Sequence, residues 1–312
     1  MENLIFSVNV VLPIFLLMCI GILLRKVKIF NDEFLEKGNN FAFKVLLPTL
    51  VFNNIYQSRI SEEVNVNLII FAVVIVLGTI GLMFLIVPRF EKDNRNIGII
   101  IQGIYRSNFV LFGVPLSSNL FGDSNLAVVT TLVAIIIPIY NFMAVIILEW
   151  YSNNKSNYKK TVVNILKNPL IIGSVLGITA SLLNSRMPVP LEKTVSEVAK
   201  TATPFSLMVL GGEIKIGNIK KNLKYIVTVS AAKLIILPAI VLAVAVAFGY
   251  RGVELGALFS MVAPSVAVSS YTMAQQYDCN SELAGQLVFM TTLFSPVTIF
   301  LFIFIMKSTG LF

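Results

Sequence analysis

The sequence has no histidine, few cysteines and few charged residues. Charged residues make up 13% of the 312 residues, against about 25% in an ordinary soluble domain. Without histidine, histidine-based acid–base catalysis and histidine-ligated metal or haem sites are excluded. The only cysteines, Cys19 and Cys279, lie far apart and in no metal-ligand spacing, so we expect them to be small core residues. Glycine-rich phosphate loops and nucleophile elbows are also missing. We therefore expect no enzyme, no cofactor and no metal.

Apolar residues are abundant and occur in long stretches. Hydrophobic residues make up 56% of the chain and the mean hydropathy is +0.85. A transmembrane helix needs about 20 mostly apolar residues. Ten such stretches occur, at 7–24, 41–57, 67–87, 97–121, 126–149, 169–184, 197–216, 225–248, 254–276 and 284–306. They leave only short connections, so the sequence predicts an all-α integral membrane protein with ten transmembrane helices.

The positive charges are distributed unevenly between the connections. Cytoplasmic loops collect Lys and Arg, and fifteen of these residues follow odd-numbered spans while six lie on the other side. The connection between the last two spans departs from this trend, because it has no Lys or Arg. We therefore expect a multi-pass protein of the plasma membrane with both termini extracytoplasmic. Its basic residues would face the anionic inner leaflet and membrane lipid rather than nucleic acid.

The two halves of the chain resemble each other. A shift of 156 residues aligns Pro13 with Pro169, Gly21 with Gly177, and the Leu-Glu-Lys sequence at 35–37 with that at 191–193. It also aligns Lys44 with Lys200 and Pro48 with Pro204. Each half, 1–156 and 157–312, holds five predicted spans. Because five is odd, the second half enters the membrane in the opposite sense, which is the inverted repeat of secondary transporters.

The fourth and ninth spans contain prolines that predict interrupted helices. Span 97–121 includes Gly113 and Pro115, and span 254–276 includes Pro264. Proline removes a backbone donor and clashes with the preceding turn, and paired interrupted spans are the best sequence indication of a transport site. Each proline is expected to open a half-helix, whose N-terminus suits an anion.

Polar and charged residues in these spans predict an anion site. Arg106 lies near mid-depth, where it is expected to be a counter-charge for a carboxylate; the alternative is a structural pair with Glu149, Glu213 or Glu254. Few acidic residues lie at mid-depth, so an anionic substrate is favoured over a cation. The substrate-binding candidates are Arg106, Ser107, Asn108, Gly113, Pro115, Pro264, Ser265, Ser269 and Ser270, with Lys44, Lys200 and Lys233 as secondary candidates.

The residues around both prolines resemble a known family. Residues 106–109 (RSNF) followed by 113–116 (GVPL), together with 263–277 (APSVAVSSYTMAQQY) and 282–286 (ELAGQ), are similar to motifs of the auxin efflux carrier family. That family includes plant PIN-type auxin exporters and bacterial proteins often labelled malate permeases. The resemblance covers essentially the whole chain.

The resemblance implies a fold and a mechanism. It implies a 5 + 5 inverted repeat of the proton-antiporter and bile-acid-symporter type, with the fourth and ninth helices crossing at their broken middles. It implies a scaffold domain from spans 1, 2, 6 and 7 and a transport domain from spans 3–5 and 8–10, which move as an elevator. Asn108 corresponds to an asparagine that contacts substrate. The long cytoplasmic loop of plant exporters is missing, and serines replace a second asparagine near Pro264, which favours a small carboxylate over auxin.

The leading hypothesis is a secondary transporter of a small organic anion such as malate. A Na⁺-coupled symporter of the bile-acid type is the first alternative, and an integral-membrane enzyme is the less favoured one. A homodimer is expected only because C₂ dimers are the commonest closed assembly.

Overall fold

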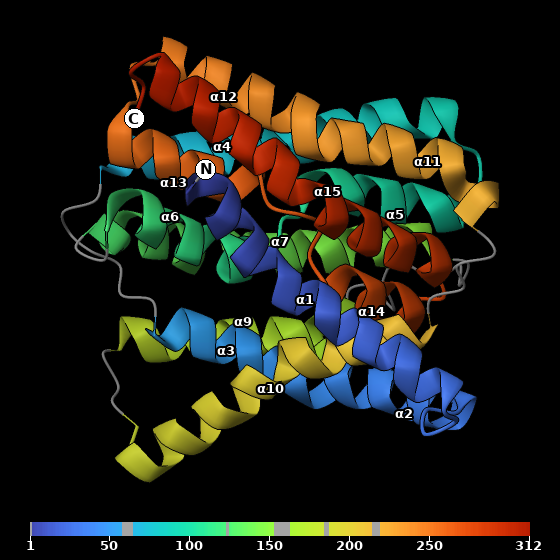
Figure 1. Cartoon of the computed structure of the whole chain (residues 1–312). Helices are drawn as coiled ribbons and strands as arrows, with labels where there is room; N and C mark the ends of the chain where they lie inside the picture. The colour runs from blue at the N-terminus through green and yellow to red at the C-terminus, as the bar shows by residue number, and fades with distance from the viewer. Residues whose placement is uncertain (1, 58–64, 123–124, 153–162, 184–186, 214–218) are drawn as a thin grey trace.

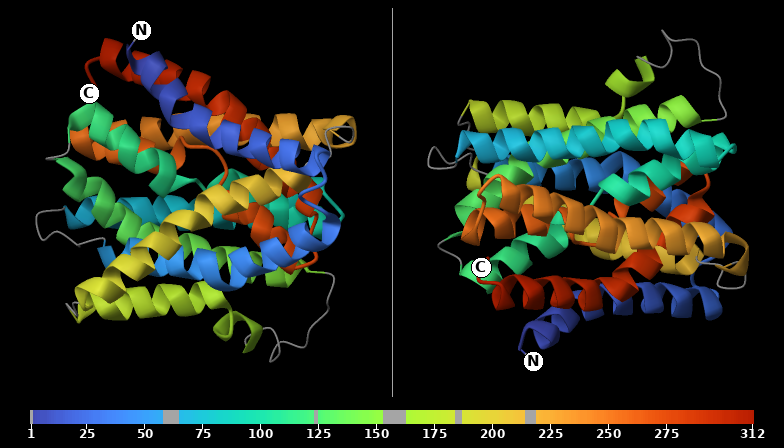
Figure 2. Two further views of the ribbon diagram at one scale, coloured as in Figure 1. Left: turned by 60° about the horizontal axis from the view of Figure 1, so that its bottom comes forward. Right: turned by 90° about the horizontal axis from the view of Figure 1, so that it is seen from above.

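The computed structural model describes residues 2–57, 65–122, 125–152, 163–183, 187–213 and 219–312. In these ranges all regular secondary structure is helical, and the single β-type feature is an isolated antiparallel bridge between Ser107 and Val266. Most helices run along a common direction, so that the described chain forms a bundle (Figures 1 and 2).

The predicted apolar stretches coincide with helices, several of them composite. In chain order these are α1 (Glu2–Lys26), α2 (Asp32–Phe41), η1 (Ala42–Leu46), α3 (Leu47–Gln57), α4 (Val66–Phe90), α5 (Asn94–Tyr105), η2 (Phe109–Gly113), α6 (Val114–Phe121), α7 (Leu126–Tyr151), α9 (Pro169–Leu182), α10 (Val189–Glu213), α11 (Ile219–Ala231), η5 (Ala232–Ile236), α12 (Leu237–Ala247), α13 (Gly252–Val262), α14 (Ser269–Gln276) and α15 (Ser281–Ser308).

Among the described residues, four helical segments are long and apolar enough to cross a membrane by themselves: Val66–Phe90, Leu126–Tyr151, Lys220–Ala247 and Ser281–Ser308. Shorter apolar helices span Phe109–Phe121, Pro169–Leu182 and Gly252–Val262. The most apolar window of Val66–Phe90 is only 17% buried inside the protein. A helix that is so apolar and so exposed requires hydrocarbon around it rather than water.

In the described ranges, three short π-helical segments each end directly before a dipeptide whose second residue is proline. The dipeptides are Leu47-Pro48 after η1, Val114-Pro115 after η2 and Leu237-Pro238 after η5. Proline has no N–H, and its ring displaces the carbonyl four residues earlier. The wider i→i+5 turn accommodates that displacement, so the helices continue through these prolines.

The interruption of the fourth span therefore lies away from its proline, whereas that of the ninth span includes Pro264. The first interruption is at Arg106–Asn108, and the next half-helix begins at Phe109, well before Pro115. Pro264 lies just after α13, while α14 begins only at Ser269. The prediction that each proline opens a half-helix is wrong, because Pro115 fits within a widened helical turn and the chain unwinds where its backbone finds hydrogen-bond partners across the bundle.

The helix pairs α1–α10 and α3–α9 pack through glycine with their backbones in contact. A Cβ atom on Gly21 of α1 would lie 2.0 Å from the carbonyl oxygen of Met208 in α10. A Cβ atom on Gly177 of α9 would lie 3.1 Å from the carbonyl oxygen of Phe52 in α3. Small residues permit this close approach between helices. The two contacts are related by the offset of 156 residues that aligns the halves of the sequence.

The helices of the bundle are arranged in two outer groups with a middle layer between them. Figure 1 shows α2, α3, α9 and α10 together at the bottom, α11, α12 and α15 at the top, and α5, α7 and α14 between them. The bundle has two ends, which we name after single residues. At the Arg95 end, the N–H of Asn280 donates to the carbonyl of Arg95 (3.1 Å); at the Phe312 end, the N–H of Gly252 donates to the carbonyl of Leu311 (2.9 Å).

Candidate functional site

Two interrupted segments cross in the middle of the bundle. The N–H of Asn108 donates to the carbonyl of Ser265 (2.9 Å), and the N–H of Ala267 donates to that of Arg106 (3.4 Å), on either side of the bridge between Ser107 and Val266. All six residues are buried. Backbone groups in a low-dielectric interior must find partners, and here each interrupted segment supplies partners for the other.

Hydroxyl groups hold this crossing in place. The N–H of Val266 donates to Thr291 Oγ1 of α15 (3.1 Å), and Thr292 Oγ1 donates to Ser265 Oγ (3.2 Å). Ser107 Oγ donates to the carbonyl of Val262, the last residue of α13 (3.3 Å). The crossing is thus fixed to α13 and α15, and it moves only if they move.

Arg106 is buried, and its guanidinium is held by neutral groups. Nη2 donates to Asn141 Oδ1 of α7 (2.6 Å), while Nη1 donates to Gln102 Oε1 (3.2 Å) and Met273 Sδ (2.9 Å). No ion pair of Arg106 occurs among the residues that the structure describes. The structural pairing with Glu149, Glu213 or Glu254 is therefore not formed, and Arg106 places a fixed positive charge beside the crossing.

Lys233 provides a second buried cation at the same level. Its side chain is fully buried, and Nζ donates to Ser107 Oγ and to the carbonyl of Val262 (3.2 Å for the latter). In the described part of the chain it has no ion-pair partner. Lys233 binds Ser107, and Arg106 directly precedes Ser107 in the chain.

A cavity of about 80 Å³ lies beside the crossing. A single water needs only about 10–15 Å³ on this scale, so there is room for several waters or for a small acid. Residues of one side of the bundle line it, namely Leu47, Leu50, Val51, Asn54, Leu170, Thr203 and Ser206. The opposing wall is formed by 106–111, Ile137, Tyr140, Asn141 and 267–269.

Three polar groups of this cavity lack a partner within the described structure. They are the side-chain nitrogens of Asn108 and Asn141 and the hydroxyl of Ser206. Because Arg106 binds the oxygen of Asn141, the amide nitrogen is left as the free donor of that side chain. A buried donor without an acceptor costs about 1–3 kcal/mol, so these groups are suited to an acceptor that enters from outside.

The remaining predicted site residues occupy different environments. Ser269 lines the cavity with Arg106, Ser107 and Asn108, and Pro264, Ser265 and Ser270 are buried in or next to the crossing. Gly113 permits close packing, because a Cβ atom there would lie 2.6 Å from the carbonyl oxygen of Ser260. Pro115 lies outside the cavity lining. Lys44 is exposed on η1, and Lys200 pairs with Glu197 at the surface.

Sequence reasoning missed Asn141 and Ser206 as cavity residues. Asn141 is a polar residue within the otherwise apolar centre of α7, and that signal was available. Ser206 lies two residues after Pro204, and serine is common enough in membrane helices that nothing in the sequence distinguishes it.

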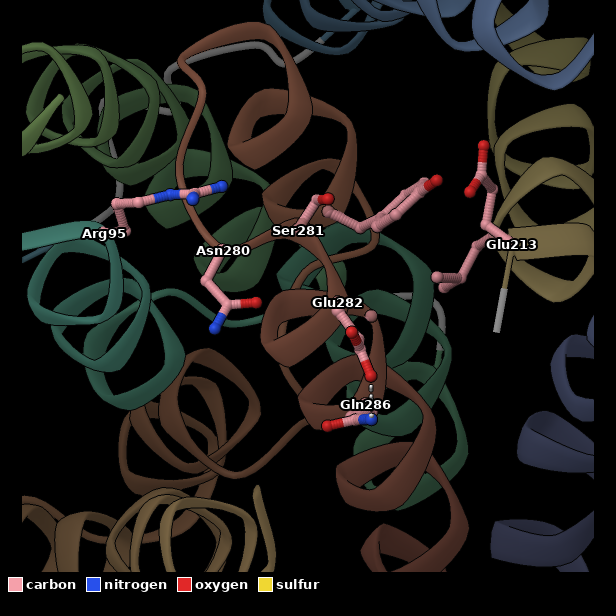
Figure 3. A pocket seen from close by; sticks show the side chains of 9 residues that line it. Arg95, Glu213, Asn280, Ser281, Glu282 and Gln286 are labelled. Carbon is pink, nitrogen blue, oxygen red and sulfur yellow. Dashed lines mark hydrogen bonds between the residues drawn. The ribbon is translucent and has the colours of Figure 1, made fainter. Parts of the chain in front are cut away.

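A second, more polar cavity of about 260 Å³ lies at the Arg95 end. Figure 3 shows Glu213 of α10 on one side and Ser281, Glu282 and Gln286 of α15 opposite, with Arg95 and Asn280 beyond them. Gln286 Nε2 donates to Glu282 Oε1 (3.3 Å). Because α10 and α14 line both cavities, the two lie one after the other along the same helices.

Outside the spans, local contacts shift the pKa values of Cys279 and Glu91. Burial raises the pKa of the Cys279 thiol, between α14 and α15, to about 12. Burial would also raise the pKa of Glu91, between α4 and α5, but hydrogen bonds from Tyr225 and from the N–H groups of Asp93 and Lys92 lower it below its ordinary value. Cys279 is thus an inert thiol, in keeping with a core role.

Comparisons with known proteins find a matching family and several similar sequences. Residues 6–303 match the family described as membrane transport protein. A protein of Rhizobium meliloti that is provisionally named a malonate transporter is 22% identical over 310 residues, covering 97% of each chain. An "uncharacterized transporter" of Methanocaldococcus jannaschii is 21% identical, covering 93% of this chain and 96% of its own. A further "uncharacterized transporter", from Methanothermobacter thermautotrophicus, is 20% identical over 94% of this chain and 96% of its own.

Proposed function

The chain belongs to the membrane transport protein family, that of the auxin efflux carriers, and from this premise we propose that it is a secondary transporter of a small organic anion. The observation that carries the proposal is the cavity beside the crossing, with the unpartnered donors of Asn108, Asn141 and Ser206. A carboxylate accepts several hydrogen bonds and could accept one from each of these three donors. The relatives are named as transporters, which favours transport over catalysis.

Charge supports an anion as the substrate. Arg106 brings a fixed positive charge to the crossing and Lys233 an amine that can carry a second one, and the described lining of the cavity contains no carboxylate. The half-helices that begin at Phe109 and Ser269 direct their N-termini toward the crossing, and such termini carry partial positive charge. A dicarboxylate of the size of malonate or malate suits a cavity of about 80 Å³.

The division into a scaffold and a transport domain is part of the proposal. The scaffold comprises α1, α2–η1–α3, α9 and α10, and the transport domain comprises the other helices. Both glycine contacts, α1 with α10 and α3 with α9, lie within the scaffold, whereas the contacts of the crossing lie within the transport domain. Residues of both the scaffold and the transport domain line the cavity. This is the arrangement that an elevator motion requires, because each body stays intact while the substrate interface slides.

We propose ten spans in two inverted halves, 1–156 and 157–312. The pair Gly21 and Met208 and the pair Gly177 and Phe52 make the same kind of contact at the repeat offset, which supports this assignment. The positive-inside rule then assigns the Arg95 end to the cytoplasm and both termini to the exterior of the plasma membrane.

A Na⁺-coupled symporter is the competing candidate. Backbone carbonyls at unwound helices often bind Na⁺ in such folds. Here the Lys233 amine already donates to the carbonyl of Val262 at the crossing, and the fixed positive charge of Arg106 beside it disfavours a further cation. We therefore favour a mechanism without Na⁺.

The test is exchange of labelled malonate in proteoliposomes, with malate and succinate as competitors and with or without Na⁺. Asn108→Ala removes a donor to a charged acceptor, worth about 1.5–3 kcal/mol, so the affinity should fall about 10- to 150-fold. Ser206→Ala should also weaken binding. Its matched control is Ser174→Ala, since the buried Ser174 hydroxyl already donates to Leu170 in its own helix (2.8 Å). Exchange that depends on Na⁺, or equal affinity in native protein and Asn108→Ala, contradicts the proposal.

A further inference from the structure

The two cations at the crossing differ in chemistry. Arg106 keeps its charge at every physiological pH. Lys233 carries an amine that can release its proton, and its two acceptors are neutral, the Ser107 hydroxyl and the Val262 carbonyl. A fully buried ammonium with only neutral acceptors is costly, so its charge depends on what else occupies the site.

Few other ionisable groups lie at the level of Lys233. The elements that pack against η5 or supply its acceptor are α5, α11, α12, α13 and α15. Their titratable or charged side chains are Arg95, Tyr105, Lys220, Lys221, Lys224, Tyr225, Glu254, Glu282 and Lys307, and Arg106 follows α5 directly. Tyr105 and Arg106 lie at the interruption of the fourth span, and the others lie in the first two turns or the last turn of their helices. Tyr140 of α7 is also near, because its hydroxyl donates to the Met261 carbonyl (3.5 Å).

A bound anion changes the balance at Lys233. Without a ligand, burial and the positive charge of Arg106 both disfavour the ammonium. Ser107 links the two sites, since it lines the cavity and accepts a hydrogen bond from Lys233. A negative charge in the cavity therefore favours the protonated amine. By reciprocity, a protonated Lys233 favours the anion by the same factor.

We propose that Lys233 is the proton-binding residue that couples anion transport to proton transport. This inference rests on the proposed function and names its coupling ion. The amine takes a proton from water on the side where the anion binds, crosses with it as the ammonium, and returns the proton to water where the anion leaves. One proton accompanies each anion, and Arg106 remains charged throughout.

Proteoliposomes that contain a trapped pH-sensitive dye test the proposal, with malonate, malate and succinate as probes and the membrane potential clamped. Addition of the transported acid to native protein should acidify the lumen. An inward proton gradient should raise uptake at least about fivefold, the lower end of typical site-to-site coupling. Lys233→Arg keeps the charge but cannot release a proton, so exchange at equal pH should persist without lumen acidification.

A control variant and the pH dependence of malonate affinity complete the test of proton coupling. Lys224→Gln is the matched control, because Lys224 is exposed on α11 of the same continuous span; it should acidify the lumen like the native protein. In detergent, malonate affinity of the native protein should fall at least about fivefold between about pH 6 and about pH 8, and that of folded Lys233→Arg or Lys233→Met should not change with pH.

Lumen acidification by Lys233→Arg at the native rate overturns the inference. Native exchange without proton movement also overturns it, and leaves the proposed function standing. Absence of exchange with all three acids means that the proposed function fails, and the coupling with it.

Discussion

Asn141→Asp tests whether the crossing binds its ligand through neutral donors backed by a fixed charge. Asn141 Oδ1 accepts from Arg106 Nη2 at 2.6 Å, and its Nδ2 is a free donor at the cavity. Aspartate has nearly the same shape and keeps the acceptor for Arg106. It removes the donor, however, and its negative charge cancels the positive charge of the guanidinium. Folding should be preserved while anion binding is lost.

The expected magnitude follows from two contributions. The lost hydrogen bond to a charged acceptor is worth about 1.5–3 kcal/mol. A carboxylate about 4 Å from the ligand, at an effective dielectric constant of about 20, adds repulsion of about 4 kcal/mol. Even if solvent screens most of the second contribution, the affinity should fall at least about a hundredfold, since about 1.4 kcal/mol corresponds to a factor of ten.

The assay pairs malonate binding with thermal unfolding of the same detergent-solubilised samples. Asn141→Asp should unfold within a few degrees of the native protein, because the Arg106 contact becomes an ion pair. Asn141→Ala, which leaves Nη2 without that acceptor, should unfold earlier. An Asn141→Asp protein that binds malonate within about threefold of the native affinity would refute the reasoning.

Two other predictions concern packing and reactivity. Gly21→Ala forces a Cβ atom to within 2.0 Å of the Met208 carbonyl and should destabilise the protein by about 1–3 kcal/mol. Gly78→Ala is the control: its Cβ atom would have nothing within 4 Å, so it should stabilise its helix by about 0.5–1 kcal/mol. Thermal unfolding distinguishes the two variants, and equal shifts in their unfolding temperatures would contradict the close contact at Gly21. In a Cys19→Ser background, Cys279, with a pKa of about 12 against an ordinary 9.0, should hold about a thousandfold less thiolate and label with maleimide far more slowly in folded than in denatured protein. Equal labelling rates would show that the thiol is accessible and ionised.

Prediction from the sequence was accurate for helices and less so for their interruptions. Long apolar stretches fix where helices form, because a run of about 20 apolar residues has few other stable structures. The interruption of the fourth span was placed at Pro115, but the chain unwinds earlier, at Arg106–Asn108, whereas Pro264 does lie in the unwound segment 263–268. Proline alone does not break a helix if a wider turn can absorb it, and the cost of unwinding is offset only where another segment supplies hydrogen bonds.

The sequence by itself determined the membrane class, the extent of the apolar helices, the repeat offset of 156 residues and the presence of buried positive charge. It identified Arg106 and Asn108 as candidates because polar groups in apolar spans are costly. Only the tertiary structure decided their partners. In the folded chain Arg106 donates to Asn141, Lys233 donates to Ser107, and Ser206 lines the cavity opposite Asn108. The physical reason is that apolar periodicity acts within one helix, whereas a binding site depends on which helices meet and on which polar groups remain without partners when they do.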